Sequence, residues 1–279
     1  MSEESWVVSG PQVIEVEDVR ALRVQLVGGR VDVVVHDAPG VLLEVHEVVG
    51  RPLEVDLDGG ELRVGYAFTL GGWEGWLEKF RNFRDRDRAD VSLAVPRSIA
   101  AKVGTVSAEG LVAGLEGQVS VSTVSGALVV DGTQGRLTAS TVSGEIVVRE
   151  HDGDLTLNSV SGELAASGAL AEVHANSVSG AVALDVTAGS TRTSVTTVSG
   201  AVTVRLPADE GVHVTAKAVS GRLVVDGEEH SVPTPGTRVV DLRSGAGGST
   251  VSTSTVTGDV TLLRGSGRLA RTASTGEDA

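Results

Sequence analysis

Thr123-Val124-Ser125-Gly126 recurs along the chain, and the distance between its copies decides the fold. Four close copies, two looser ones and a degenerate one follow the same pattern: Thr141–Gly144, Ser159–Gly162, Ser177–Gly180, Thr197–Gly200, Ala218–Gly221, Thr255–Gly258 and Thr105–Ala108. The first four glycines lie 18 residues apart, and the next two steps are 20 and 21. A period near 20 residues is typical of solenoids, in which each repeat buries its apolar face by stacking on the next. The sequence therefore predicts an all-β fold, a single parallel β-solenoid with coils of 18–21 residues.

Alignment of the copies predicts which residues face the core. Apolar and polar residues alternate over short stretches, which is the period of a half-buried strand. Five apolar columns are expected to point inward: Val119, Leu137, Leu155, Val173; Val121, Ala139, Leu157, Ala175; Val124, Val142, Val160, Val178; Leu128, Ile146, Leu164, Val182; and Val130, Val148, Ala166, Leu184. The alternation changes parity between Leu157 and Val160, so we expect a bend near Asn158 and another at the glycine.

Polar residues stack in the same register. They form two ladders: Ser122, Ser140, Asn158, Asn176; and Thr123, Thr141, Ser159, Ser177. Such ladders satisfy backbone groups at solenoid corners, which is a structural role. An alternative is that each Thr-Val-Ser directs two hydroxyls outward, as on some ice-binding solenoids. Glu145 and Glu163 also stack, which leaves a shared cation as a second alternative.

The chain divides into an N-terminal extension (1–12), a solenoid domain (13–263) and a tail (264–279) expected to be disordered. Within the domain, residues 13–67 read as capping strands, 68–90 as an insertion and 91–263 as the repeats. The last copy, around Thr257, is expected to leave an open sheet edge.

The insertion breaks the strand pattern. Trp73, Trp76, Leu77, Phe80 and Phe83 follow the spacing of an amphipathic helix, so we expect one helix near 73–88. A lid over the solenoid is one interpretation. Trp and Arg are typical interface anchors, so a surface for self-association or a protein partner at Trp73, Trp76, Phe80 and Phe83 is another, and peripheral membrane binding is a third.

Composition limits the class of function. The net charge of −14 disfavours nucleic acid and anionic membranes as partners. The chain has no cysteine, and we see neither a signal peptide nor a membrane span, so we expect a cytoplasmic protein while a non-classical surface location stays open. Catalytic motifs are lacking, and the six histidines, His36, His46, His151, His174, His213 and His230, read as surface residues. We expect neither an enzyme nor a cofactor or metal.

The Val-Ser-Gly repeats, together with the upstream strand Val91-Ser92-Leu93-Ala94-Val95-Pro96, resemble the bacterial family DUF4097, labelled "putative adhesin". The resemblance covers about residues 13–262 and implies a β-solenoid without catalytic residues. The aromatic insertion resembles one in actinobacterial members.

These observations lead to two functional hypotheses. The first is a non-enzymatic structural or interaction protein that presents a rigid solenoid surface and is adhesin-like by resemblance. The second is a carbohydrate-binding or polysaccharide-processing β-helix, for which Glu145 and Glu163 are the candidate carboxylates, because neighbouring coils would place them near 5 Å apart.

Overall fold

The protein folds as one large sheet of mostly parallel strands. The structure is a computed structural model that describes residues 4–66, 87–208, 211–229, 238–244 and 248–265. All 24 regular elements among these residues are strands: β1 Glu4–Val8, β2 Gln12–Val16, β3 Ala21–Leu26, β4 Gly28–His36, β5 Val41–Val49, β6 Leu53–Asp58, β7 Glu61–Gly65, β8 Arg88–Pro96, β9 Ala100–Thr105, β10 Glu109–Ala113, β11 Glu116–Thr123, β12 Leu128–Asp131, β13 Gln134–Thr141, β14 Ile146–Ser159, β15 Leu164–Ser177, β16 Val182–Val186, β17 Arg192–Thr197, β18 Val202–Leu206, β19 Gly211–Ala218, β20 Leu223–Val225, β21 Glu228–Glu229, β22 Arg238–Ser244, β23 Gly248–Thr255 and β24 Val260–Arg264. The predicted all-β class is confirmed.

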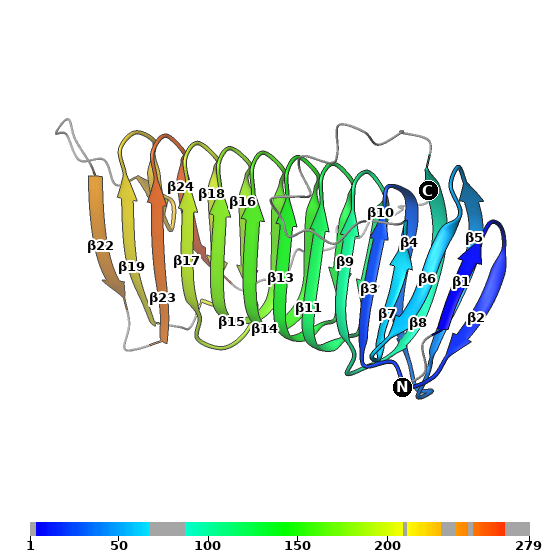
Figure 1. The fold of residues 1–279 in the computed structure, drawn as a ribbon. Coiled ribbons are helices and arrows are strands. Elements are labelled where there is room, and N and C mark those ends of the chain that lie inside the picture. Colours follow the sequence, from blue (N-terminus) through cyan, green and yellow to red (C-terminus); the bar gives the residue numbers. More distant parts are fainter. Residues whose placement is uncertain (1–3, 67–86, 209–210, 230–237, 245–247, 266–279) are drawn as a thin grey trace, which may run out of the picture.

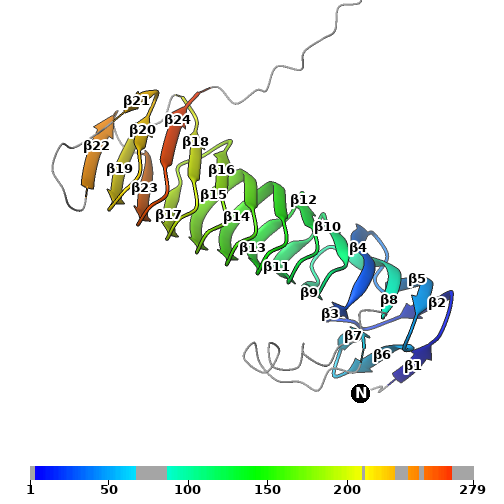
Figure 2. The same ribbon diagram turned by 90° about the horizontal axis from the view of Figure 1, so that it is seen from above.

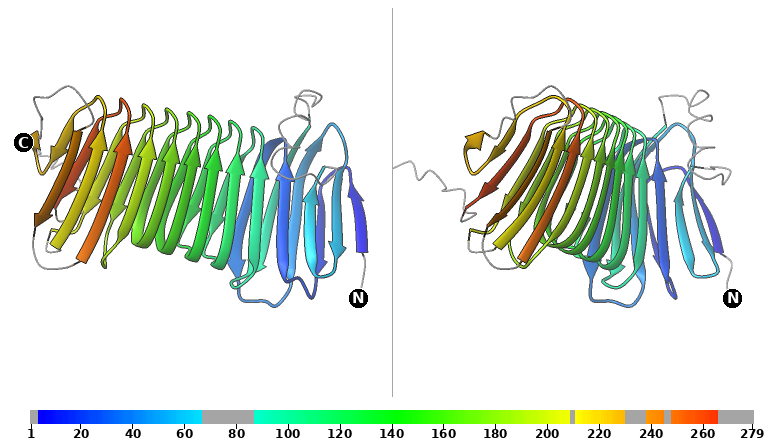
Figure 3. Two further views of the ribbon diagram at one scale, coloured as in Figure 1. Left: turned by 60° about the vertical axis from the view of Figure 1, so that its left-hand side comes forward. Right: turned by 90° about the vertical axis from the view of Figure 1, so that its left-hand side faces the viewer.

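The strands lie in two rows that face each other (Figures 1 and 3). Row A runs, in spatial order, β1, β6, β7, β3, β9, β11, β13, β14, β15, β17, β23, β19, β22. Row B runs β2, β5, β8, β4, β10, β12, β14, β15, β16, β18, β24, β20, β21. Strands β14 and β15 continue around one corner, so each contributes to both rows. We call one strand of each row and the corner between them a coil.

The 18-residue period sets the register between coils. Val119 lies beside Leu137, Leu137 beside Leu155 and Leu155 beside Val173, as predicted. Four of the five predicted inward columns are fully buried, and they fill the space between the rows with Val, Leu, Ile and Ala. Burial of this aliphatic column, in which each side chain touches its equivalents above and below, drives the stacking.

The prediction for the remaining column is wrong. Val160 and Val178 are 47% and 49% exposed, whereas Ser159 and Ser177, one position earlier, are buried. The physical reason is that β14 does not bend at Asn158 but continues its alternation to Ser159, which therefore faces the core. The corner begins only at the valine, whose side chain points out.

A glycine column holds the coils together at this corner. A Cβ on Gly162 would lie 2.0 Å from the Gly144 carbonyl oxygen, and one on Gly180 would lie 1.9 Å from the Gly162 oxygen. Real Cβ atoms do not approach an oxygen so closely, so any side chain here would force adjacent coils apart. Glycine is therefore the residue that allows the coils to approach this closely at Gly162 and Gly180.

At both ends, spatial order departs from chain order. The coil 248–264 stands between the coils 192–206 and 211–225, so β23 separates β17 from β19 (Figure 1). At the other end, β3 separates β7 from β9. The open edge predicted near Thr257 is therefore wrong, because that copy is interior and the outermost strand of row A is β22.

The N-terminal region caps the stack with antiparallel strands (Figure 2). β6 pairs with β7 and β1 with β6, while β5 pairs with β8 and β2 with β5. Residues 4–8, within the predicted extension, thus belong to the sheet. The predicted tail lies outside the described residues beyond Gly265.

The inserted helix is a prediction that the structure corrects. No described residue is helical, and Arg88, placed at the end of the helix, begins β8 instead. From Ala89 the side chains alternate between buried and half-buried, as in a strand, and the segment pairs with β4 on one side and β5 on the other. Residues 67–86, including the four aromatic candidates Trp73, Trp76, Phe80 and Phe83, lie outside the described residues.

The corrected orientation of the repeat predicts opposite outcomes at adjacent sites. Val160→Asp should change the free energy of unfolding by no more than about 0.5–1 kcal/mol, because the carboxylate stays in water. Leu157→Ala, three residues earlier on β14 and fully buried, should cost about 2–5 kcal/mol. Urea unfolding followed by circular dichroism measures both. A Val160→Asp variant that unfolds would contradict this orientation.

The glycine column predicts a second contrast. Gly162→Ala should destabilise the protein by about 3 kcal/mol or more, because the new methyl group overlaps the carbonyl of the next coil. Gly10→Ala is the control, since nothing lies within 4 Å of a Cβ there. Thermal unfolding of the two variants measures the difference, and equal melting temperatures would show that adjacent coils can separate at this corner at little cost.

Candidate interaction surfaces

The hydroxyl that opens each repeat has a structural role inside the corner. Thr141 Oγ1 donates to the Gly144 carbonyl at 3.0 Å, and Ser177 Oγ donates to the Gly180 carbonyl at 2.8 Å. Thr123 Oγ1 instead accepts from the Gly126 N–H at 2.9 Å, and Thr197 and Thr255 accept in the same way from the glycine three residues later. These buried hydroxyls therefore satisfy the backbone of their own turn.

The serine at the third position ties neighbouring coils. Ser143 Oγ donates to the Val124 carbonyl and Ser161 Oγ to the Val142 carbonyl, both at 3.1 Å. The same bond recurs at Ser107, Ser125, Ser179, Ser199 and Thr257. Both hydroxyls of Thr-Val-Ser thus bond to the backbone, as the structural interpretation expected, and the alternative of an outward, ice-binding grid is wrong.

The valine between them forms an exposed ridge along the same corner. Five of these side chains are between 44% and 51% exposed: Val160, Val178, Val198, Val219 and Val256. They follow one another at the coil spacing of about 4.8 Å. The ridge is narrow, because serines and glycines flank it on one side.

A different grid of polar side chains covers the outer face of row A. Two columns follow the six strands β11, β13, β14, β15, β17 and β23, and we call them the polar face: Ser120, Thr138, Thr156, His174, Ser194, Ser252; and Ser122, Ser140, Asn158, Asn176, Thr196, Ser254. The second column contains the ladder predicted from Ser122 to Asn176. Sequence analysis missed the first, although the same alternation marks it.

The polar face differs from the corner in its hydrogen bonding. Asn176 Nδ2 donates to Asn158 Oδ1 at 3.2 Å, and His174 Nε2 lies 3.4 Å from Glu172 Oε1. None of the nine Ser and Thr hydroxyls of the polar face is bonded to another described residue. The face therefore offers free donors and acceptors on a flat, rigid strand surface.

Charged residues border the polar face. Arg136 with Asp154, and Glu172 with Arg192, form long ion pairs of 3.9 and 3.8 Å beside it. Lys102 follows toward the N-terminal end, and Lys217 lies toward the other end. The outer face of row B is different, since its central column is aliphatic over four coils and partly exposed: Leu111, Val129, Val147 and Ala165.

The structure keeps Glu145 and Glu163 in adjacent coils at the glycine corner. Ile146 N–H donates to the Glu163 carbonyl, which places the two acids in successive coils, and both side chains are exposed. No group of three potential metal ligands occurs among the described residues. The two carboxylates therefore share an exposed edge, away from the polar face.

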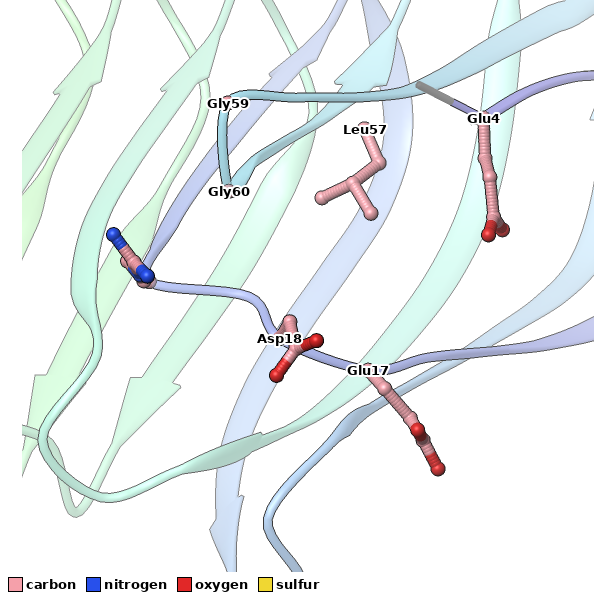
Figure 4. Close-up of a pocket in the computed structure, with 7 residues that line it drawn as sticks. Glu4, Glu17, Asp18, Leu57, Gly59 and Gly60 are labelled. Atoms are coloured by element: carbon pink, nitrogen blue, oxygen red, sulfur yellow. The ribbon is translucent and has the colours of Figure 1, made fainter. Parts of the chain in front are cut away.

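Two hollows lie at the ends of the stack. The first, of about 530 Å³, is bounded by Glu4, Glu17, Asp18, Arg20 and the turn Gly59-Gly60 near the N-terminus (Figure 4). The second, of about 290 Å³, opens at the other end, where Val212, Val214, Val225 and Leu242 meet Arg243 and the Asp226–Arg264 ion pair. The second hollow is the exposed end of the aliphatic core.

Tyr66 and Asp87, the described residues on either side of 67–86, both lie beside Arg51. Arg51 holds the nearly buried Asp87 through its side chain, at 2.8 Å, and through its backbone N–H, at 3.0 Å. The Arg51 guanidinium also lies 5.4 Å from the centre of the Tyr66 ring. Burial raises the pKa of the Tyr66 hydroxyl to about 12. The negative charge of Asp87 also raises this pKa, and the positive charge of Arg51 lowers it.

His151 contradicts the expectation of surface histidines. It is 1% exposed and lies at a corner. The equivalent residues in the two preceding coils are Leu115 and Thr133. Its Nε2 lies 3.2 Å from the Asp154 carbonyl and its Nδ1 lies 2.9 Å from Thr133 Oγ1. Nδ1 also lies 3.1 Å from the Thr133 carbonyl oxygen, so the neutral ring donates to the carbonyl of Asp154 or to that of Thr133, according to which nitrogen carries the hydrogen. Burial lowers the pKa of His151, although the carbonyls and the carboxylates of Asp152 and Asp154 oppose this.

With this geometry in view, comparison with known proteins identifies the class. Residues 115–263 match the model of the family described as Toastrack DUF4097, and the chain belongs to this family. The match covers most of the repeats and confirms the resemblance to DUF4097 over residues 115–263. No match is found among curated proteins. Among the described residues there is no helix long and apolar enough to cross a membrane.

Solved structures with the same fold are known. One is a "putative lipid binding protein" from Parabacteroides distasonis, with a TM-score of 0.55 and 12% identity, covering 91% of this chain and 97% of the other. Another is a "putative adhesin" from Parabacteroides merdae, with a TM-score of 0.50 and 13% identity, covering 94% and 96%. At such identities the likeness extends to the fold alone.

His151 predicts a pH dependence of stability. Its pKa is lower in the folded protein than the unfolded value near 6.5, so the unfolded chain binds the proton first as pH falls. Its neutral form therefore stabilises the fold fully above about pH 6.5, and this contribution is lost as pH falls from there toward the folded pKa, by up to about 1.4 kcal/mol per pH unit.

Unfolding free energies between pH 7.5 and 5 measure this effect. His151→Leu, which copies Leu115 of the same corner column, should flatten the profile, whereas the exposed His174→Asn should keep it. A wild-type slope that survives in His151→Leu would assign the dependence to another group.

Proposed function

We propose that the protein is a non-enzymatic interaction protein, a β-solenoid rod that binds through its polar face in an adhesin-like manner. The observation that carries this proposal is the contrast between two sets of hydroxyls. Those of the corner are bonded within or between coils, whereas those of the polar face are free. A free hydroxyl exchanges water for a ligand without first breaking a bond inside the protein.

Rigidity supports the same proposal. The grid is carried by backbone strands whose register is set by the coils, so binding orders little of the protein and costs little conformational entropy. The name of the Parabacteroides merdae structure with this fold, "putative adhesin", agrees with an interaction role. The aromatic residues Trp73, Trp76, Phe80 and Phe83 stay a separate prediction of a protein-binding or self-association surface.

A carbohydrate is the ligand class favoured by the polar face itself. Its two columns carry hydroxyls, amides and one imidazole, without a formal charge on any carboxylate or amine. They repeat at about 4.8 Å along the stack, so equivalent hydroxyls and amides form straight rows along which an extended chain rich in hydroxyl groups can hydrogen-bond. The net charge of −14 disfavours acidic polymers, so we propose a neutral polysaccharide lying along the stack.

Binding assays test the proposal. The probes are insoluble cellulose, chitin, xylan and mannan, with immobilised matrix proteins as a second panel. Ser140→Glu with Asn158→Glu should weaken retention at least tenfold, because it removes a hydroxyl and an amide donor, breaks the flat contact with longer side chains and adds two charges that are costly to dehydrate. The control, Val129→Glu with Val147→Glu, adds the same charge to row B and should bind like the wild type.

The outcomes separate the parts of the proposal. Retention on matrix proteins alone, lost in the polar-face variant, keeps the binding face but rejects carbohydrate as its ligand. Equal retention by both double variants rejects the polar face. Release of soluble sugar from any polysaccharide overturns the non-enzymatic role, and Glu145→Gln and Glu163→Gln would then be the variants to compare.

A further inference from the structure

The two ends of the stack share a topological feature that the repeats do not require. At the C-terminal end, β23 pairs in parallel with β17 over Arg192–Thr197 and with β19 over Gly211–Ala218. β24 likewise pairs with β18 and with β20. The coil 248–264, last in the chain among the described residues, is therefore held on both sides.

The N-terminal end repeats this arrangement. β3 pairs with β7 on one side and β9 on the other, and β4 pairs with β8 and β10. The first coil of the chain, 21–36, is thus also second from the end of the stack. At each end the outermost position in the stack is therefore not held by the first or last coil of the chain. At the C-terminal end an earlier coil, 211–225, covers the coil 248–264, and at the N-terminal end the later strands β7 and β8 cover the coil 21–36.

This order couples the coils mechanically. Among the described strands, β19 and β20 reach the body of the stack only through β23 and β24. Their other pairings, β19 with β22 and β20 with β21, are antiparallel pairs outside the stack. Two-stranded pairs of this kind are marginal alone, so the outer coil leaves the body when the inner one is removed.

Short ion pairs reinforce these joints. Arg222 of the outer coil holds Asp259 through its side chain at 3.0 Å and its backbone N–H at 2.8 Å. Asp226, after β20, accepts from the backbone N–H of Arg264 at 2.9 Å and from its guanidinium. At the other end Glu61 of β7 lies 2.9 Å from Arg23 of β3. Between the regular coils, pairs such as Arg136–Asp154 are longer, at 3.9 Å.

We propose that the intercalated coils are mechanical locks, and that the rod bears tension applied through its chain ends. In a solenoid whose coils follow chain order, a pulled end peels away one coil at a time, because each exposed coil has one neighbour. Here the pulled coil lies between two others and is fastened to the outer one at Arg222–Asp259 and Arg264–Asp226. The inference does not depend on which ligand the polar face binds.

Optical-tweezer unfolding tests the lock. The chain has no cysteine, so two introduced cysteines define the handles. Gln134→Cys anchors the regular coils, and Gly265→Cys pulls the intercalated coil. Residues 207–265 should be released in one step of about 200 Å, since outer and inner coils leave together and each residue extends by about 3.4 Å. Loss of one 18-residue coil would give about 60 Å.

A second handle position supplies the comparison. Glu228→Cys pulls the outer coil directly, which has a parallel partner on one side only, and should yield at a lower force than Gly265→Cys. Arg222→Ala with Arg264→Ala should lower the force at Gly265→Cys, whereas Arg136→Ala should leave it unchanged. Sequential steps of about 60 Å from Gly265→Cys, or equal forces from the two handles, would overturn the proposal.

Discussion

The close approach of each corner glycine to the carbonyl oxygen of its equivalent in the neighbouring coil is the constraint on which the structure depends. Each glycine of the corner lies so close to the carbonyl of the preceding one that a Cβ would sit about 2 Å from it. That approach keeps the strands of both rows within hydrogen-bonding distance over the whole stack. It also sets the spacing of the coils that carry the glycine, because a side chain on any of these glycines would push two coils apart at the corner.

The other residues of the tetrapeptide follow from that contact. A tight corner leaves backbone groups that need partners, and the buried Thr or Ser supplies one within its own coil. The following serine supplies a bond to the next coil, and the valine between them is left in water. Once the corner has used its hydroxyls, the free polar groups of this region lie on the flat face of row A, which is why we place binding there.

Much of this could be read from the sequence, and the failures have definite causes. The period gave the register of Val119, Leu137, Leu155 and Val173 correctly, because stacked coils must bring equivalent positions together. It did not give the direction of Val160, since a buried hydroxyl and an exposed valine reverse the usual hydrophobic pattern. Only the bond from Ser159 to the Gly162 carbonyl explains that reversal. The order of the end coils was also beyond reach, because the period does not say which side of the stack the next copy joins.

Cysteine accessibility tests the orientation of the repeat most directly. Ser159→Cys and Val160→Cys are single thiols at adjacent positions in a chain without cysteine, and each is close in size to the residue it replaces. Labelled with a thiol reagent under native conditions, the thiol at 160 should react at the rate of an exposed cysteine, and the thiol at 159 only after unfolding. Rapid labelling at 159 with protection at 160 would contradict the account.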